Sequence, residues 1–178
     1  YRYALGLLWF MLSSCVLAQD VSLDGEWQLY RGAESVLPAS AEWQTVRVPL
    51  LENQVNDRPY LWYRRTLSIP REWTGKRLFV RFEAVRFVST VYVDGQEVGG
   101  HYGGWEPFEV EVTGVCRPGR EHQLLVRVQD VTGVCRGEIR SAKTGRGQRF
   151  VDQVKDSVMA PIGSQFSRVG IWQSTSLV

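Results

Sequence analysis

Short segments of alternating apolar and polar residues follow one another along most of the chain, and this pattern restricts the fold more than any other feature. The segments are rich in β-branched and aromatic residues, and turn signals such as Asp94-Gly95 and Gly99-Gly100 separate them. They cover residues 26–30, 45–48, 62–69, 77–82, 88–93, 108–112, 122–128 and 171–178. No apolar stripe of helical period extends over three turns. The pattern predicts an all-β protein, an antiparallel β-sandwich with a jelly roll as the expected topology.

The length of 178 residues fits one such domain and limits what the chain can do alone. A (β/α)₈ barrel needs about 250 residues, so any such barrel must lie outside this chain. The chain has 21 Lys and Arg against 19 Asp and Glu, a net charge of +2. This balance argues against a nucleic-acid surface, and we expect no nucleic-acid partner.

Residues 1–18 have the pattern of a leader. Arg2 precedes an apolar run that is too short to span a bilayer and ends in the small-residue pattern 16–18, which is typical of a signal-peptide cleavage site. We therefore expect a signal peptide over 1–18, a folded domain over 19–178, no membrane span, and a secreted or periplasmic protein. A buried core helix is one alternative for this segment. Lipoprotein processing at 12–15, with a lipid on Cys15, is another. Because the chain begins with Tyr1 and not Met, we expect a fragment.

Loss or lipidation of Cys15 would leave Cys116 and Cys135 as a possible pair in an oxidising compartment. A disulfide between them would close a loop of about 20 residues and stabilise the fold by about 3 kcal/mol in the loop-entropy model. Two free thiols are the other interpretation, and the sequence leaves both open. His101 and His122 lack the short spacings of a zinc site, so we expect neither a metal nor a cofactor.

The segment between Asp130 and Gly170 interrupts the β pattern. Within it, residues 133–149 contain five Lys and Arg residues against Glu138 alone. Long segments without strand alternation are usually functional or disordered. The basic cluster is consistent with a solvated loop, or with a surface that docks on another domain or on an anionic sugar.

No catalytic group stands out in the sequence. Glu109 and Glu111 have a spacing that glycosidic hydrolysis could use, but they alternate with apolar residues and are better explained as the solvent face of a strand. The chain lacks a G-x-S-x-G sequence and a phosphate-binding P-loop. The sequence therefore contains no recognisable catalytic arrangement.

The segment 93–108 combines glycines with aromatic residues, and it contains a hairpin turn, Tyr102 and Trp105. Aromatic rings can stack on sugar rings, and glycines allow close approach of the backbone. The segment is consistent with a sugar-binding platform. It is also consistent with tight turns and aromatic residues that cap the sandwich.

Several of these segments together resemble the N-terminal sugar-binding domain of glycoside hydrolase family 2, the β-galactosidase, β-glucuronidase and β-mannosidase group. The resemblance rests mainly on 91–108, with Val112-Thr113 after it. Flanking segments agree in the same order: 23–27, Val48-Pro49, 61–65 with Ile69-Pro70, 73–77 and 170–173. It covers about residues 21–178.

The resemblance implies a galactose-binding-domain-like jelly roll that precedes an immunoglobulin-like sandwich and a catalytic barrel. It implies a retaining glycosidase with two glutamates in that barrel, and hence an inactive isolated chain. It also implies that Asp130, at the end of the strand 125–130, binds a sugar hydroxyl, and that Asn56, or Asn53, plays a similar part. Initiation of a turn is the other interpretation of Asp130.

Three functions follow as hypotheses. The first is the sugar-binding domain of an exported glycoside hydrolase that acts in carbohydrate metabolism on a β-glycoside, with Asp130 in its sugar subsite. The second is a free-standing carbohydrate-binding module that uses Trp105, Tyr102 and Asp130. The third is a purely structural domain.

Overall fold

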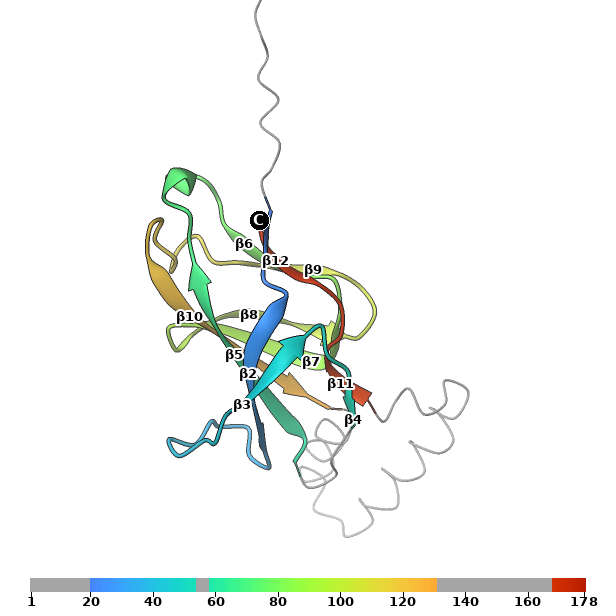
Figure 1. Ribbon diagram of the computed structural model, residues 1–178. Helices are drawn as coiled ribbons and strands as arrows, with labels where there is room; N and C mark the ends of the chain where they lie inside the picture. The colour runs from blue at the N-terminus through green and yellow to red at the C-terminus, as the bar shows by residue number, and fades with distance from the viewer. Residues whose placement is uncertain (1–19, 54–57, 131–167) are drawn as a thin grey trace, which may run out of the picture.

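The computed structural model describes residues 20–53, 58–130 and 168–178 (Figure 1), and in this part every strand pairing is antiparallel. One 3₁₀ turn, η1 (Arg71–Trp73), follows the fifth strand. The strands are β1 (Val21–Ser22), β2 (Gly25–Gly32), β3 (Gln44–Val48), β4 (Glu52–Asn53), β5 (Tyr60–Ser68), β6 (Phe79–Phe82), β7 (Val85–Val93), β8 (Gln96–Gly103), β9 (Phe108–Glu111), β10 (Glu121–Gln129), β11 (Arg168–Ile171) and β12 (Thr175–Leu177).

The strands form two sheets, which confirms the predicted antiparallel β-sandwich of jelly-roll type. The smaller sheet has the order β1-β12-β6-β9, and the larger has the order β3-β2-β5-β10-β7-β11-β4, with β8 paired to β7. Figure 1 shows that β4, β11 and the end of β10 gather at one end of the sandwich. Asp130, one of the candidate residues from the sequence, follows β10 directly at this end.

Alternating side chains of both sheets form the core. On β2 the core residues are Trp27 and Leu29, with the exposed Gln28 between them. On β5 Leu61 and Tyr63 belong to the core, and Trp62 between them is buried on the opposite face of the strand. Trp27 packs edge-on against Tyr63, with ring centroids 6.5 Å apart, and its indole N–H donates to the carbonyl of Leu23 at 2.7 Å. Burial of an aromatic ring with its polar atom satisfied contributes about 2–3 kcal/mol.

The Asp94-Gly95 turn joins β7 to β8 as the sequence predicts. Both residues have positive φ, 49° at Asp94 and 83° at Gly95, which is the backbone conformation of a two-residue hairpin turn. The Asp94 backbone N–H also donates to the carbonyl of Gln123 on β10 at 2.9 Å. The hairpin is thus fixed to the strand that leads to Asp130.

Several expectations fall on residues outside the described ranges. These are the leader 1–18, Asn56, Cys135 and the basic segment 133–149, and each remains a prediction. Within the ranges that the structure describes, no helix has the length and apolar character needed to cross a membrane.

Candidate functional site

Asp130 lies where β10 ends, and its side chain is almost completely buried, with 2% exposed. The preceding residue, Gln129, pairs with Tyr60 on β5 and with Val88 on β7. The Asp130 backbone N–H donates to the carbonyl of Pro59 at 3.0 Å, which fixes the direction of the chain after the strand. The carboxylate is therefore held by the centre of the large sheet at the end where β4 and β11 also lie.

Trp105 belongs to an aromatic and cationic cluster at the same end of the fold. Its ring is 53% exposed and packs edge-on against Trp172, with centroids 5.2 Å apart and an interplanar angle of 80°. The Trp172 indole N–H donates to the carbonyl of Gly104 at 2.9 Å. The guanidinium of Arg86 lies over the Trp105 ring at 4.6 Å from its centroid. An exposed ring held on two sides in this way can stack on a ligand without first being ordered.

Arg86 is the buried cation of this cluster, with 2% of its surface exposed. Burial lowers the pKa of its guanidinium below the usual value. Arg86 lies on β7 opposite Gly170 of β11. It comes two residues before Val88, which pairs with Gln129 of β10. A Cβ at Gly104 would come within 3.0 Å of the Arg86 side chain, so the glycine permits this close packing.

Tyr102 projects from β8 beside the same end and is 65% exposed. It pairs with Val88, which on its other side pairs with Gln129. Its ring contacts Phe87 edge-on, with centroids 5.3 Å apart. The sheet therefore brings Tyr102 and Asp130 to the same end of the fold, on two strands that β7 separates.

Asp130, Trp105 and Tyr102, which the sequence indicates as candidates, all lie at one end of the sandwich. Arg86 and Trp172 were not predicted from the sequence. Trp172 lies within the family-like segment 170–173, so the resemblance could have indicated it. Arg86 is a lone arginine in a strand, and nothing in the sequence pattern sets it apart. Asn53, the second asparagine considered, pairs with Arg168 at the adjacent β4–β11 edge.

A second polar cluster lies near this edge. Arg31 of β2 and Glu52 of β4 form an ion pair, and the Tyr63 hydroxyl is buried beside them. Burial, followed by the charge of Glu52, raises the pKa of Tyr63 well above its usual value. Tyr63 is therefore a neutral phenol in the fold, and the ion pair links two strands that are not adjacent in the sheet.

His122, Asp94 and Cys116 form a third cluster that looks like a nucleophilic triad in composition. His122 Nδ1 lies 2.6 Å from Asp94 Oδ2, and its Nε2 accepts the Arg117 backbone N–H at 2.9 Å. Burial, and then the charge of Asp94, raises the pKa of the Cys116 thiol to about 11. Since both imidazole nitrogens are occupied and the thiol is protonated, the cluster is structural.

Glu109 and Glu111 lie on the solvent face of β9, which confirms their sequence interpretation. Glu111 forms a two-point pair with Arg77, and Glu109 contacts Arg81 at 3.3 Å. These arginine contacts hold the carboxylates on the outside of the small sheet. Neither glutamate is placed to act on a sugar as one of a catalytic pair.

Comparisons with known proteins show what the chain is similar to. The family model described as "Glycosyl hydrolases family 2, sugar binding domain" matches residues 9–178. A β-glucuronidase of Bacteroides fragilis is 29% identical over 142 residues, which are 70% of this chain and 18% of that protein. A β-galactosidase of Thermoanaerobacter pseudethanolicus is 38% identical over 64 residues, 36% of this chain and 9% of that protein.

Solved structures are similar as well. The crystal structure of Ruminococcus gnavus β-glucuronidase superposes with a TM-score of 0.54 at 27% identity, covering 62% of this chain and 21% of that one. The chain spans about a fifth or less of the length of these relatives.

Proposed function

The chain belongs to glycosyl hydrolase family 2 through its sugar-binding domain, and from this premise we propose that it is the N-terminal domain of an exported, retaining glycoside hydrolase. The two catalytic glutamates would lie in a barrel outside this chain, after an immunoglobulin-like sandwich. The isolated chain would then be inactive. Export rests on the leader pattern of residues 1–18, with Cys15 as the site of a possible lipid anchor.

β-Glucuronides are the substrate class that we propose for the parent enzyme. The support comes from relatives named β-glucuronidase in Bacteroides fragilis, Paenibacillus borealis and other organisms, at 29–38% identity in the first two. A matching β-galactosidase makes β-galactosides the class to compare. Hydrolysis rates of the parent on nitrophenyl β-glucuronide, β-galactoside and β-mannoside test this proposal, and a preference for either of the last two would contradict it.

The position of Asp130 carries the proposed role of this domain. Asp130 follows the central strand β10 directly and lies at the end of the sandwich that also carries Trp105, and this placement supports a recognition role. An ionised carboxylate accepts hydrogen bonds only, and sugar hydroxyls are suitable donors. Trp105 and Tyr102 supply exposed aromatic surface at the same end, where the barrel would complete the sugar subsite.

The test is substitution of Asp130 in the intact parent enzyme. We expect Asp130→Ala to lower kcat/KM by about a hundredfold or more, because hydroxyl contacts that strengthen in the transition state contribute several kcal/mol. Asp20→Asn, at an exposed position, is the matched control and should leave kcat/KM unchanged. Unchanged kcat/KM in a folded Asp130→Ala enzyme would support a purely structural domain.

A free-standing carbohydrate-binding module is the second candidate, and the exposure of Tyr102 and Trp105 favours it. It predicts that the isolated chain binds a β-glycoside at millimolar concentration through these rings. Titration calorimetry with glucuronides, galactosides and mannosides, repeated on Trp105→Ala, tests it. Lack of any binding that Trp105→Ala removes, together with the Asp130 effect in the parent, would favour the first function.

A further inference from the structure

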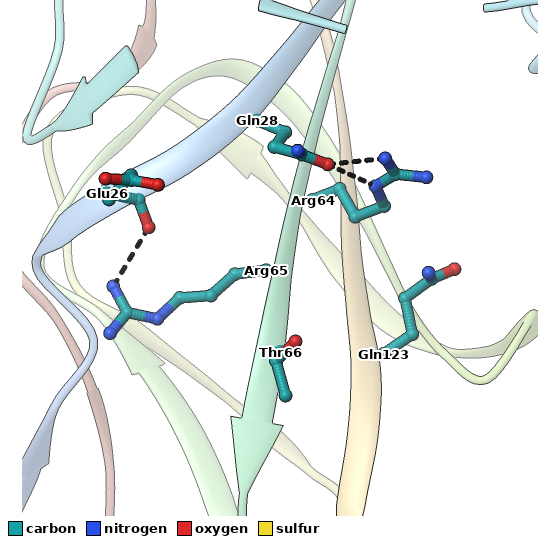
Figure 2. A pocket seen from close by; sticks show the side chains of 6 residues that line it. All are labelled: Glu26, Gln28, Arg64, Arg65, Thr66 and Gln123. Atoms are coloured by element: carbon teal, nitrogen blue, oxygen red, sulfur yellow. Dashed lines mark hydrogen bonds between the residues drawn. The ribbon is translucent and has the colours of Figure 1, made fainter. Parts of the chain in front are cut away.

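A polar groove lies on the large sheet away from the Asp130 end. Its volume is about 520 Å³, and it is lined by polar side chains of three strands: Glu26 and Gln28 of β2, Arg64, Arg65 and Thr66 of β5, and Gln123 of β10 (Figure 2). We call it the β2–β5 groove. Its volume is in the range of ordinary small-molecule sites, but its polar lining does not suit an apolar ligand.

The groove exists because β2 and β5 separate. Their pairing ends at Gln28 and Arg64, while β2 continues to Gly25 in pairing with β3 alone. Arg65 spans the gap, and its Nη1 donates to the carbonyls of Leu23 at 2.6 Å and Asp24 at 3.1 Å (Figure 2 shows its further bond to the Glu26 carbonyl). The opening is thus maintained by hydrogen bonds that replace the missing strand pairing.

Arg64 is held in one orientation beside this opening. Its Nε donates to Gln28 Oε1 at 2.9 Å, its Nη2 donates to the same oxygen, and its guanidinium stacks on Trp43 at 4.0 Å from the ring centroid. A free arginine side chain loses much rotamer freedom when binding orders it. Because Arg64 is already ordered, it can bind a ligand at a lower entropic cost.

The hydrogen-bonding groups of the groove identify the class of ligand. Gln28 uses its oxygen for Arg64, which leaves its amide N–H groups as donors, and the remaining N–H groups of Arg64 are donors too. Glu26 is an acceptor, and Thr66 and Gln123 can do both. A phosphate would be opposed by Glu26, and a cation by the two arginines. Hydroxyl groups, each of which donates and accepts, match this mixture.

We propose that the β2–β5 groove is a second carbohydrate-binding site, which takes neutral sugar residues through Arg64, Gln28 and Gln123. It is separate from the Asp130 site, because Gln123 and Asp130 lie at opposite ends of β10, about 23 Å apart at the usual rise of a strand. The groove would hold a neutral part of a glycan while the other end of the domain contributes to the cleaved subsite. The proposal does not depend on Asp130 binding sugar.

The experiment is an NMR titration of the ¹⁵N-labelled 178-residue chain with cellobiose and, separately, with lactose. We expect millimolar binding of at least one, with shifts of the side-chain amides of Gln28 and Gln123 and of the Arg64 Nε–H. Arg64→Ala should weaken binding at least tenfold, and Gln123→Ala severalfold. Arg77→Ala is the matched control, since this exposed arginine lies beside Glu111 on the other sheet, and it should bind like the original chain.

Three results would overturn the proposal. One is the absence of shifts in the groove up to about 50 mM disaccharide, beyond the range of weak specific binding. The second is a response of Trp105 and Tyr102 alone, which would leave the Asp130-end function intact. The third is tighter binding of inorganic phosphate than of either disaccharide at the same groove resonances. Asp130→Asn should leave the groove shifts unchanged, so this site and the proposed function can fail independently.

Discussion

At the scale of single residues, Gly170 is a position where an added Cβ would be both strained and crowded. It lies on β11 with φ of +141°, a conformation that residues with a Cβ rarely adopt. A Cβ there would lie 2.5 Å from the Leu50 carbonyl oxygen and 2.8 Å from the Tyr63 hydroxyl. Neither neighbour can move easily, because Leu50 donates its N–H to Ile171 and Tyr63 is a core residue. The placement of β11 between β7 and β4, next to the Asp130 end, depends on this glycine.

We therefore expect Gly170→Ala to lower the free energy of unfolding by about 3 kcal/mol or more, or to prevent folding. Gly114→Ala is the control, because a Cβ at Gly114 meets no atom within 4 Å. Its effect should be below about 0.5 kcal/mol. Urea unfolding followed by tryptophan fluorescence measures both variants. Equal stability of the two variants would mean that the β11 edge does not constrain the fold.

At the scale of elements, the strands that alternate in sequence were predictable and those rich in glycine were not. The segments 62–69 and 122–128 correspond to β5 and β10, because both bury one face against the core. β8 was missed, since Gly99, Gly100 and Gly103 remove the side chains on which the alternation depends. A Cβ at Gly100 would lie 2.2 Å from the Ser89 carbonyl oxygen, so these glycines allow β8 to approach β7. The expected strand 171–178 also divides into β11 and β12.

The separation of β2 from β5 gives a prediction about a single side chain that joins two elements. Arg65→Met keeps the length of the side chain but removes its hydrogen bonds to the carbonyls of Leu23, Asp24 and Glu26. We expect a loss of about 1–3 kcal/mol in the free energy of unfolding, because the half-buried Asp24 carbonyl loses the Arg65 donor and the Leu23 carbonyl keeps only its bond from the Trp27 indole. Faster hydrogen exchange of the β2 amides should accompany it.

Arg47→Met, on the exposed face of β3, is the control for Arg65→Met. It should change the free energy of unfolding by less than about 0.5 kcal/mol, as surface substitutions usually do. If the two variants were equally stable, water would replace Arg65 at the carbonyls of Asp24 and Glu26, and Arg65 would not maintain the groove.

At the scale of the whole molecule, the fold class could be predicted from local pattern, but the site could be predicted only in part. The family-like segments indicated Trp105, Tyr102 and Asp130 as separate candidates, without indicating that they lie at one end of the fold. Their gathering at one end depends on long-range contacts, such as the hydrogen bond from Trp172 to Gly104 and the pairing of Arg86 with Gly170. Such contacts leave no periodic signal in sequence. The same reason explains why the Asp94–His122 pair and the β2–β5 groove were not predicted.

Cys116 reports on the integrity of the whole core. Its side chain is 5% exposed within the main apolar cluster, and its backbone N–H donates to the Val112 carbonyl at 2.9 Å. The pKa of its thiol is about 11 in the fold, raised by burial and then by Asp94, against about 8.5 in an unfolded chain. A raised pKa favours the protonated, folded form below pH 8.5, and this stabilisation is lost as the pH rises towards 11.

We expect the thiol of Cys116 to react with a disulfide reagent only when the core opens. In a chain carrying Cys15→Ser and Cys135→Ser, labelling at pH 8 should be about a thousandfold or more slower than in concentrated urea, and its rate should rise with urea with the slope of global unfolding. Rapid labelling that is insensitive to urea would instead show that the edge beside Cys116 opens locally.

The same assay on the unsubstituted chain, in urea without reductant, tests the pairing with Cys135. A Cys116 that is bridged to Cys135 stays unlabelled until reductant is added. Two free thiols react at once.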